Sequence, residues 1–292
     1  MTIKHLVISG GGPSLIQALS VVQELERIKF IERNNLESIY GTSAGAILGV
    51  LICLKMEWES INDYLVKRPW HELFSIKVQH ILDAYTKKGI FDHVIIEKCF
   101  KPLFDAMDIS MNITLEDFYE YSNIELHLFA FEINQFQIED ISYKSHPKLE
   151  LMKAIQMTSA LPVILTPICV DNKCYIDGGV VCNYPLKYCL ENNNVDEVLG
   201  IKNKYGFEKN YIHAESTLLD FIMNILFKII YSLSTDHLQP TIVNEIECNA
   251  SLMSIDFLKK VLKNMELRKE LFKSGIDSVN SFIEKTQNEK VL

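Results

Sequence analysis

Hydrophobic residues in the first fifty positions alternate between short strand-like runs and longer helical ones. HLVIS (5–9) is apolar and β-branched and ends at three glycines, so it predicts a buried strand entering a glycine loop. Pro13 suits the first turn of a helix, which is expected to extend over residues 15–28. ESIYG (37–41) predicts a second strand, and AILGVLICL (46–54) is apolar all round, as in a buried helix. This order predicts an α/β fold with a largely parallel sheet and helices on both faces.

The later pattern extends this sheet and then becomes helical. Residues 57–120 are mixed, charged and aromatic, and they predict an insertion of helices and loops. Further strands are expected at 124–133, 163–170, 173–177 and 197–202, with a helix closed by Pro162 at 148–162. From His213 onward the pattern predicts helices alone, at 214–235, about 251–272 and about 275–287. We therefore expect an α/β domain at 1–210 and a helical C-terminal extension at 211–292, packed on it or beside it.

The longest apolar run, LLDFIMNILFKIIYSL (218–233), predicts an amphipathic helix. Asp220, Asn224 and Lys228 share one face at helical spacing, which argues against a membrane span. We expect the apolar side of this helix to pack on the core. The N-terminus lacks the long apolar stretch and small-residue cleavage site of a signal peptide. A cytoplasmic location, with peripheral contact at membranes, is the expectation.

Composition excludes several functions. The net charge of −9 and the absence of a Lys/Arg-rich run give no electrostatic support for nucleic-acid binding. With 48% hydrophobic residues, the 292-residue chain can bury a sizeable core. The seven cysteines are scattered without a C-x-x-C pair, so we expect reduced thiols of an intracellular protein rather than a disulfide frame or a zinc site. No ligand spacing for a metal is visible, and no cofactor is expected.

Glycines mark the candidate site. Each of three clusters follows a predicted strand, and the carboxyl ends of parallel strands lie at one sheet edge, where ligands bind. We therefore expect the clusters to meet in space. Together they hold seven of the 12 glycines: Gly10, Gly11, Gly12, Gly41, Gly45, Gly178 and Gly179.

The GTSAG stretch (41–45) predicts a sharp strand-to-helix turn with the hydroxyl of Ser43 exposed. The helix dipole would help to stabilise an alkoxide there, and the Ala44 amide is placed to join an oxyanion hole. The amides of Gly10–Gly12 would supply further donors to a developing oxyanion. The alternatives are an ordinary glycine-rich turn and a phosphate-binding loop, which also exposes backbone amides at a helix N-terminus. However, G-x-x-x-x-G-K-[ST] is absent, and Leu15 occupies the last glycine position of G-x-G-x-x-G.

A serine that acts as a nucleophile also needs a base to take its proton, and Asp177 is the candidate. It heads the Asp-Gly-Gly turn directly after the strand-like KCYI, whereas none of the eight histidines lies beside a glycine turn. Alone, Asp-Gly would indicate an ordinary tight turn. Together with the other two clusters, the pattern favours catalysis by a serine and an aspartate.

Three ordered segments, GGGPSL, GTSAG and TSALPVILTPICVDNKCYIDGGVVCNYP, resemble the patatin-like phospholipases over roughly residues 3–202. The resemblance implies a three-layer α/β/α fold and a lipid acyl hydrolase with a Ser–Asp dyad. It makes Ser43 the nucleophile, Asp177 its base and Gly10–Gly12 the oxyanion donors. Asn183 and Pro185 match the N-x-P that follows the family's Asp-Gly-Gly. A lipid or phospholipid is the implied substrate, and no cofactor is implied.

The chain departs from the family in the glycine loop. Where the family often has G-G-G-x-R/K-G, Ser14 replaces the basic residue and Leu15 the last glycine. Two alternatives stay open. An α/β-hydrolase esterase would need a histidine after the acid, and His213 or His237 would be the candidates. A non-catalytic lipid-binding protein could also retain the fold. The sequence leaves the oligomeric state open.

Overall fold

The structure is a computed structural model that describes residues 2–205, 212–233, 239–250 and 254–289. Its centre is an eight-stranded mixed sheet with a separate two-stranded sheet beside it. The strands are β1 (His5–Ile8), β2 (Ser38–Thr42), β3 (Gly89–Phe91), β4 (Glu125–Glu132), β5 (Gln137–Ile141), β6 (Val163–Leu165), β7 (Ile168–Val170), β8 (Lys173–Asp177), β9 (Val198–Tyr205) and β10 (Glu245–Ala250).

The main sheet has the order β10-β9-β1-β2-β4-β8-β7, and β5 pairs with β4 outside this path. The five strands from β10 to β4 are parallel to one another, whereas β5 and β8 run antiparallel to β4 and β7 antiparallel to β8. β3 and β6 form the parallel two-stranded sheet. The predicted α/β class with a mostly parallel sheet is confirmed.

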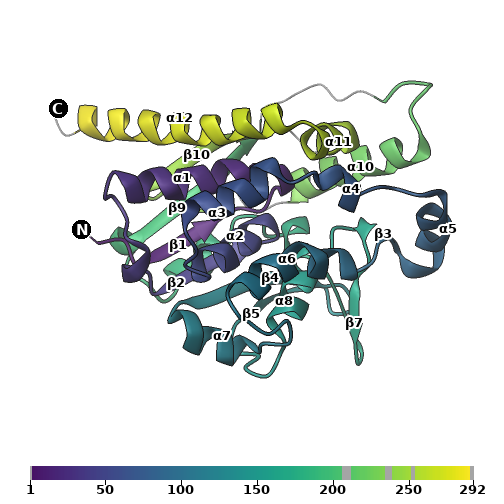
Figure 1. The fold of residues 1–292 in the computed structure, drawn as a ribbon, viewed down its shortest axis with the longest axis horizontal. Coiled ribbons are helices and arrows are strands. Elements are labelled where there is room, and N and C mark those ends of the chain that lie inside the picture. Colours follow the sequence, from purple (N-terminus) through teal and green to yellow (C-terminus); the bar gives the residue numbers. More distant parts are fainter. Residues whose placement is uncertain (1, 206–211, 234–238, 251–253, 290–292) are drawn as a thin grey trace.

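Helices cover the sheet, and α1 and α12 lie side by side across it (Figure 1). The helices are α1 (Leu15–Arg27), α2 (Ala44–Cys53), α3 (Trp58–Asn62), α4 (Trp70–Leu73), α5 (Val78–Lys87), α6 (Val94–Ala106), α7 (Leu115–Ser122), α8 (Leu151–Ser159), α9 (Leu186–Leu190), α10 (Leu218–Leu233), α11 (Ile255–Lys263) and α12 (Met265–Glu289).

The core has two parts because successive side chains of a strand point to opposite faces. Leu6 and Ile8 of β1 join the larger cluster, with α1, α2 and α12. Val7, between them, joins a smaller cluster that includes Tyr184 and residues of α9. The sheet is therefore buried on both sides, as expected where parallel strands carry continuous apolar runs.

The C-terminal part differs from the helix-only expectation. β10 pairs in parallel with β9 and adds a strand to the main sheet, with Ile246 opposite Ile201. Its EIECNA segment alternates buried and exposed positions, which is the strand period of two. The two last helices meet near Asn264 rather than near residue 274. The proposed division at residue 210 stays a prediction.

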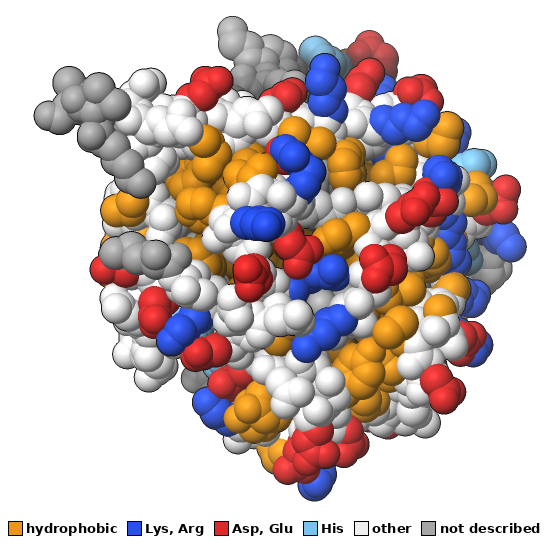
Figure 2. Space-filling view, turned by 60° about the vertical axis from the view of Figure 1, so that its left-hand side comes forward, with side chains coloured by type: hydrophobic (Ala, Val, Ile, Leu, Met, Phe, Trp, Pro, Cys, Tyr) orange, Lys and Arg blue, Asp and Glu red, His pale blue; other side chains and the backbone are white. Residues whose placement is uncertain are grey.

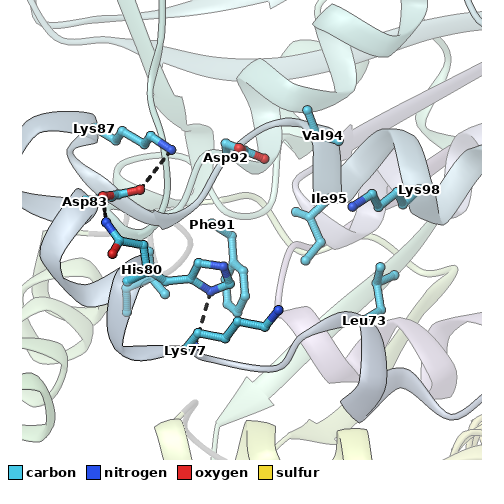
Figure 3. A pocket seen from close by; sticks show the side chains of 12 residues that line it. Leu73, Lys77, His80, Asp83, Lys87, Phe91, Asp92, Val94, Ile95 and Lys98 are labelled. Carbon is cyan, nitrogen blue, oxygen red and sulfur yellow. Dashed lines mark hydrogen bonds and ion pairs between the residues drawn. The ribbon is translucent and has the colours of Figure 1, made fainter.

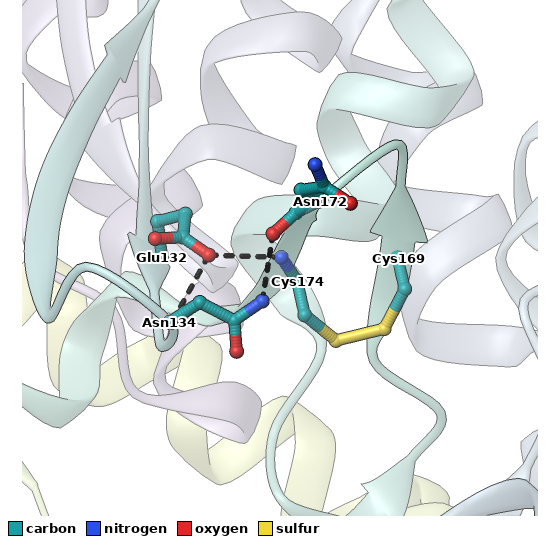
Figure 4. The surroundings of a disulfide bond; sticks show 5 residues. All are labelled: Glu132, Asn134, Cys169, Asn172 and Cys174. Carbon is teal, nitrogen blue, oxygen red and sulfur yellow. Dashed lines mark hydrogen bonds between the residues drawn. A yellow bond between two sulfur atoms is a disulfide. The ribbon is translucent and has the colours of Figure 1, made fainter.

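The expectation of seven free thiols is wrong for one pair. Cys169 of β7 and Cys174 of β8 lie directly opposite each other and form a disulfide (Figure 4). Beside it, a carboxylate oxygen of Glu132 accepts hydrogen bonds from the amides of Asn134 (3.0 Å) and Cys174 (2.9 Å). Sequence alone missed the pair because hairpin register brings the two together. The cysteines therefore no longer argue for an intracellular location.

Surface charge is mixed: lysines and arginines alternate with acidic side chains on the face that Figure 2 shows. That face also carries hydrophobic side chains in several patches between the charged groups. None of the described helices is long and apolar enough to cross a membrane.

Candidate active site

Ser43 occupies a strained turn between β2 and α2. Its backbone has φ 53° and ψ −117°, a conformation that a residue with a side chain adopts rarely and at a cost of about 1–3 kcal/mol. The flanking glycines permit this turn. A Cβ at Gly45 would lie 2.2 Å from the Ile8 carbonyl oxygen, and one at Gly41 would lie 2.6 Å from the Ala46 amide nitrogen. The predicted strand-to-helix turn is present, and Ser43 stays partly exposed.

Two threonines hold the turn, and the sequence analysis assigned neither of them a role. The Thr158 hydroxyl accepts a hydrogen bond from the Ser43 amide (3.0 Å) and donates one to the Phe129 carbonyl (2.5 Å). The Thr42 hydroxyl donates to the Cys182 carbonyl (3.0 Å). The turn is thus tied to β4, α8 and the segment after Asp177. The TSALP stretch that contains Thr158 was the available signal, but its hydroxyl partner could not be known from sequence.

Asp177 is buried beside Ser43. The side chain is only 5% exposed, and burial raises its pKa to about 6. Hydrogen bonds from the Ser43 side chain and the Gly179 amide, the latter at 2.7 Å, oppose this rise because they favour the charged carboxylate. A carboxylate with a pKa near 6 is ionised at neutral pH and is a stronger base than an ordinary aspartate.

Asp177 reaches Ser43 by a different route from the one expected. The prediction assumed that all three glycine clusters follow parallel strands, but β8 is antiparallel to β4, with Asp177 opposite Ala130. Phe129, the preceding residue of β4, is level with Thr42 of β2. The end of β8 therefore arrives at the carboxyl edge from the opposite direction. The clusters meet, although one strand runs the other way.

The glycine loop lies directly against the turn. A Cβ at Gly10 would be 3.3 Å from the Cβ of Ser43 and 2.6 Å from the side-chain oxygen of Asn183. The Gly10 amide donates to the Asn183 carbonyl (3.0 Å), so the protein already uses this predicted oxyanion donor. Gly11, Gly12 and Ala44 remain candidate donors. Gly11 (φ 155°) and Gly12 (φ 53°) both have backbone conformations that favour glycine.

A side-chain clamp holds the same loop. The Asn203 amide nitrogen, from β9, donates to the Gly10 carbonyl (2.7 Å) and to the Ser14 hydroxyl (2.8 Å). The Ser14 hydroxyl itself donates to the Gly11 carbonyl (3.2 Å). Asn183 adds a longer bond to the Gly10 carbonyl (3.2 Å). Ser14, where the family often has a basic residue, is therefore part of a neutral network that connects the loop to the neighbouring strand.

Of the two histidines considered for a triad, only His213 lies among the described residues. His213 lies in an exposed turn, where its amide donates to the Ser216 hydroxyl (3.0 Å). His237 is outside the described residues. His127 of β4 is partly buried and stacks on Tyr40, and its Nδ1 lies 2.8 Å from Asp140. Burial alone would lower the pKa of His127, but hydrogen bonds to Asp140 and Glu125 outweigh it and raise the pKa.

In the described part of the chain, no group of three or more His, Cys, Asp or Glu side chains is arranged to hold a metal ion. The groups that can act on a substrate at this edge are the hydroxyl of Ser43, the carboxylate of Asp177 and the backbone amides around them.

A serine on a strand-to-helix turn of a mostly parallel α/β sheet, with a buried carboxylate beside it, is an arrangement typical of serine hydrolases. The model of the patatin-like phospholipase family matches residues 6–190, which is more than half of the chain and includes all three glycine clusters. The chain belongs to the patatin-like phospholipase family.

Individual relatives agree with this assignment. A protein named probable lipid hydrolase 463L, of Invertebrate iridescent virus 6, is 26% identical over 218 residues, which cover 72% of this chain and 73% of that protein. The uncharacterized protein R571 of Acanthamoeba polyphaga mimivirus is 25% identical and covers 98% of this chain and 95% of its own. The crystal structure of VipD from Legionella pneumophila has a TM-score of 0.58 at 18% identity, covering 98% of this chain and 67% of VipD. This structural likeness supports the fold.

Proposed function

We propose that the protein hydrolyses fatty-acyl esters of lipids through a dyad of Ser43 and Asp177. The observation that carries the proposal is the buried carboxylate of Asp177 facing the Ser43 side chain at the strained turn. The family's name and that of the viral relative indicate a lipid as the substrate class. A phospholipid or lysophospholipid ester is the specific substrate we propose.

The reaction follows from the geometry in two steps. Asp177 accepts the proton of the Ser43 hydroxyl while the Ser43 oxygen attacks the ester carbonyl carbon. The amides of Gly11, Gly12 and Ala44 stabilise the resulting oxyanion. The proton then passes to the leaving alcohol, and an acyl-enzyme remains. Asp177 next deprotonates a water molecule that attacks the acyl carbonyl, and the acid leaves as Ser43 recovers its proton. The backbone supplies the electrophilic stabilisation, so the proposal needs no metal.

The α/β-hydrolase alternative differs in how the base acts. A Ser-His-Asp triad places a histidine between the serine and the acid. The direct interaction of Ser43 with Asp177 favours the dyad. The non-catalytic alternative is disfavoured by the strained backbone at Ser43, because strained backbone conformations cluster at functional sites.

A serine-reactive fluorophosphonate probe tests the nucleophile. We expect the probe to label the wild-type protein at Ser43, and Ser43→Ala to abolish both labelling and ester hydrolysis. Ser60→Ala, which removes an exposed hydroxyl from α3, is the matched control and should label normally. Hydrolysis near the wild-type rate in Ser43→Ala would refute the nucleophile. A wild-type protein without labelling or hydrolysis would support the non-catalytic alternative.

A further inference from the structure

Helix α5 has its amphipathic faces reversed with respect to the protein. Its polar side chains Gln79, His80, Asp83 and Lys87 line a hollow of about 430 Å³ between the helix and the body of the molecule (Figure 3). Phe91 and Ile95 also line that hollow, and the ring centroids of His80 and Phe91 lie 5.8 Å apart. A surface helix normally turns its apolar stripe toward the core and its polar face to water. In α5 the polar face is the one directed at the protein.

The apolar face of α5 is exposed. Val78, Ile81, Leu82 and Tyr85 follow the i, i+3, i+4, i+7 spacing and so form one stripe. Each of these side chains is between 58% and 93% exposed, and no residue of α5 is buried. We call these four residues the α5 stripe. Large apolar side chains exposed together in this way usually mark an interaction site.

Helix α10 has a second exposed stripe. Its inner side packs through the buried Met223 and the partly buried Leu219. The expectation that the apolar side of this helix packs on the core is therefore wrong for most of that side. Its outer side is also apolar and between 39% and 74% exposed. We call the residues of this outer side the α10 stripe: Leu218, Phe221, Ile222, Ile225 and Ile229.

Both helices are connected to the candidate active site, α10 directly and α5 through intervening elements. Helix α10 contacts the 3₁₀ turn Gly178–Val180 that directly follows Asp177. Helix α5 packs on β3, which pairs with β6, and β6 begins three residues after Ala160, whose carbonyl accepts the Asp177 amide (3.0 Å). Figure 1 accordingly places α5, β3 and α10 at one end of the molecule. The two helices that carry the stripes therefore lie at the same end of the molecule, and α10 packs on the turn that follows Asp177.

We propose that the α5 and α10 stripes together dock the protein on the surface of a phospholipid bilayer that contains anionic lipid. Exposed Lys77, Lys87 and Lys88 stand at the two ends of α5, although Asp83 pairs with Lys87 at 3.3 Å. Lysines beside an apolar stripe suit the anionic headgroup region, because their charge stays at the interface while the stripe enters the acyl boundary. The inference rests on the proposed lipid substrate, since such a substrate is found in that surface.

Vesicle binding tests the docking surface without turnover. In the Ser43→Ala background, co-sedimentation is measured with phosphatidylcholine vesicles with and without phosphatidylglycerol. We expect Ile81→Ser/Leu82→Ser and Ile225→Ser/Ile229→Ser each to weaken binding at least about tenfold, because each removes several methylene groups from the contact. The matched control is Val195→Ser/Val243→Ser, which changes two exposed valines that precede the amino ends of β9 and β10. The control should bind like the parent.

The lysines supply a second variant that keeps the apolar stripe. Lys77→Gln/Lys88→Gln should weaken binding about fivefold or more with phosphatidylglycerol, and should have little effect without it. Thermal melts of all variants identify any that fail to fold. Parent-like vesicle binding by folded variants of both stripes would overturn the proposal, and so would an equal loss in the valine control.

Two further outcomes have separate meanings. If light scattering shows that the α5 variant changes the oligomeric state while vesicle binding is unchanged, the stripe contacts a second copy and the proposal is wrong. If the wild-type protein hydrolyses no ester, yet its vesicle binding depends on both stripes, the proposed function fails while the docking surface stands.

Discussion

Helices α2 and α5 each have ten residues, yet they relate to the protein in opposite ways. Nine residues of α2 are buried, and its N-terminus presents Ser43 at the sheet edge. No residue of α5 is buried, and its apolar side chains point away from the body. The first helix is fixed by packing along nearly its whole length, which the proposed nucleophile at a strained turn requires. Helix α5 instead exposes its apolar face, which is available to the proposed bilayer surface.

The largest expected effect concerns Asp177, the proposed base for Ser43 at the N-terminus of α2. Asp177→Asn should lower kcat by about 10² to 10⁴, because an amide cannot accept the Ser43 proton near neutral pH. Steady-state kinetics on a lipid ester measures this. His213→Ala is the control and should change kcat by less than about tenfold. A severe loss in the histidine variant with a normal melt would instead favour the triad alternative.

The same variant should be more stable. The folded pKa of Asp177, about 6, lies above the ordinary 3.8, so the folded state binds this proton more tightly and loses stability as pH rises between these values. At pH 7 the burial of the charge costs about 1–3 kcal/mol, which asparagine would recover. Urea unfolding at pH 7 measures the gain. Lower stability of Asp177→Asn would contradict this account of the pKa.

A pair of leucines compares the helices directly. Leu48→Ala in α2 should lower the free energy of unfolding by about 2–5 kcal/mol, since it leaves a cavity at a fully buried site. Leu82→Ala in α5 should change it by less than about 0.5 kcal/mol, since that side chain is 65% exposed. Urea denaturation provides both values. Equal costs would mean that the apolar face of α5 packs inward after all.

The pH dependence of catalysis should show the ionisation of Asp177. Only its carboxylate can accept the Ser43 proton, so kcat/KM should fall about tenfold per unit as the pH drops below about 6, and should be flat from pH 7 to 8. A pH profile with a stable protein over that range measures it. A fall centred near pH 4 would indicate that the carboxylate is solvated in the working enzyme.

A smaller effect is expected from the clamp on the glycine loop. Asn203→Ala removes hydrogen bonds to the Gly10 carbonyl and the Ser14 hydroxyl, each worth about 0.5–1.5 kcal/mol. We expect kcat to fall about tenfold with KM within about twofold, because the loop acts on the oxyanion. Asn203→Asp keeps the size of the side chain but cannot donate these hydrogen bonds, so its kcat should fall by a similar factor. Asn193→Ala, which loses amide bonds elsewhere, is the control.

Sequence patterning was sufficient for much of the fold and for choosing candidate residues, Ser43 and Asp177, that the structure brings together. β1, β2, α1 and α2 lie within one or two residues of their predicted bounds, because glycines mark the ends of uniform apolar runs. The same glycines identified the turn at Ser43 and the loop at Gly10. The wrong predictions concerned how two segments lie relative to each other, such as the antiparallel direction of β8 relative to β4.

Other features depend on contacts that no local pattern shows. Asn203 reaches the Gly10 loop only because β9 lies next to β1. Thr158 supports the Ser43 amide from α8, 115 positions later in the chain. Helix α5 has the spacing of an ordinary core-facing helix, and only its packing shows that the stripe faces outward. These features are decided by tertiary structure.

The pairing of β10 with β9 has a consequence for the order in which the chain can fold. Until residue 250 is made, β9 is an open edge of the sheet, and its partner follows about forty residues later. At about 5–20 residues per second, that interval during synthesis lasts about 2–10 s. An unpaired edge strand is a template for wrong pairing between chains. Between the synthesis of β9 and that of β10, the nascent chain therefore exposes an edge strand that can pair wrongly with another chain.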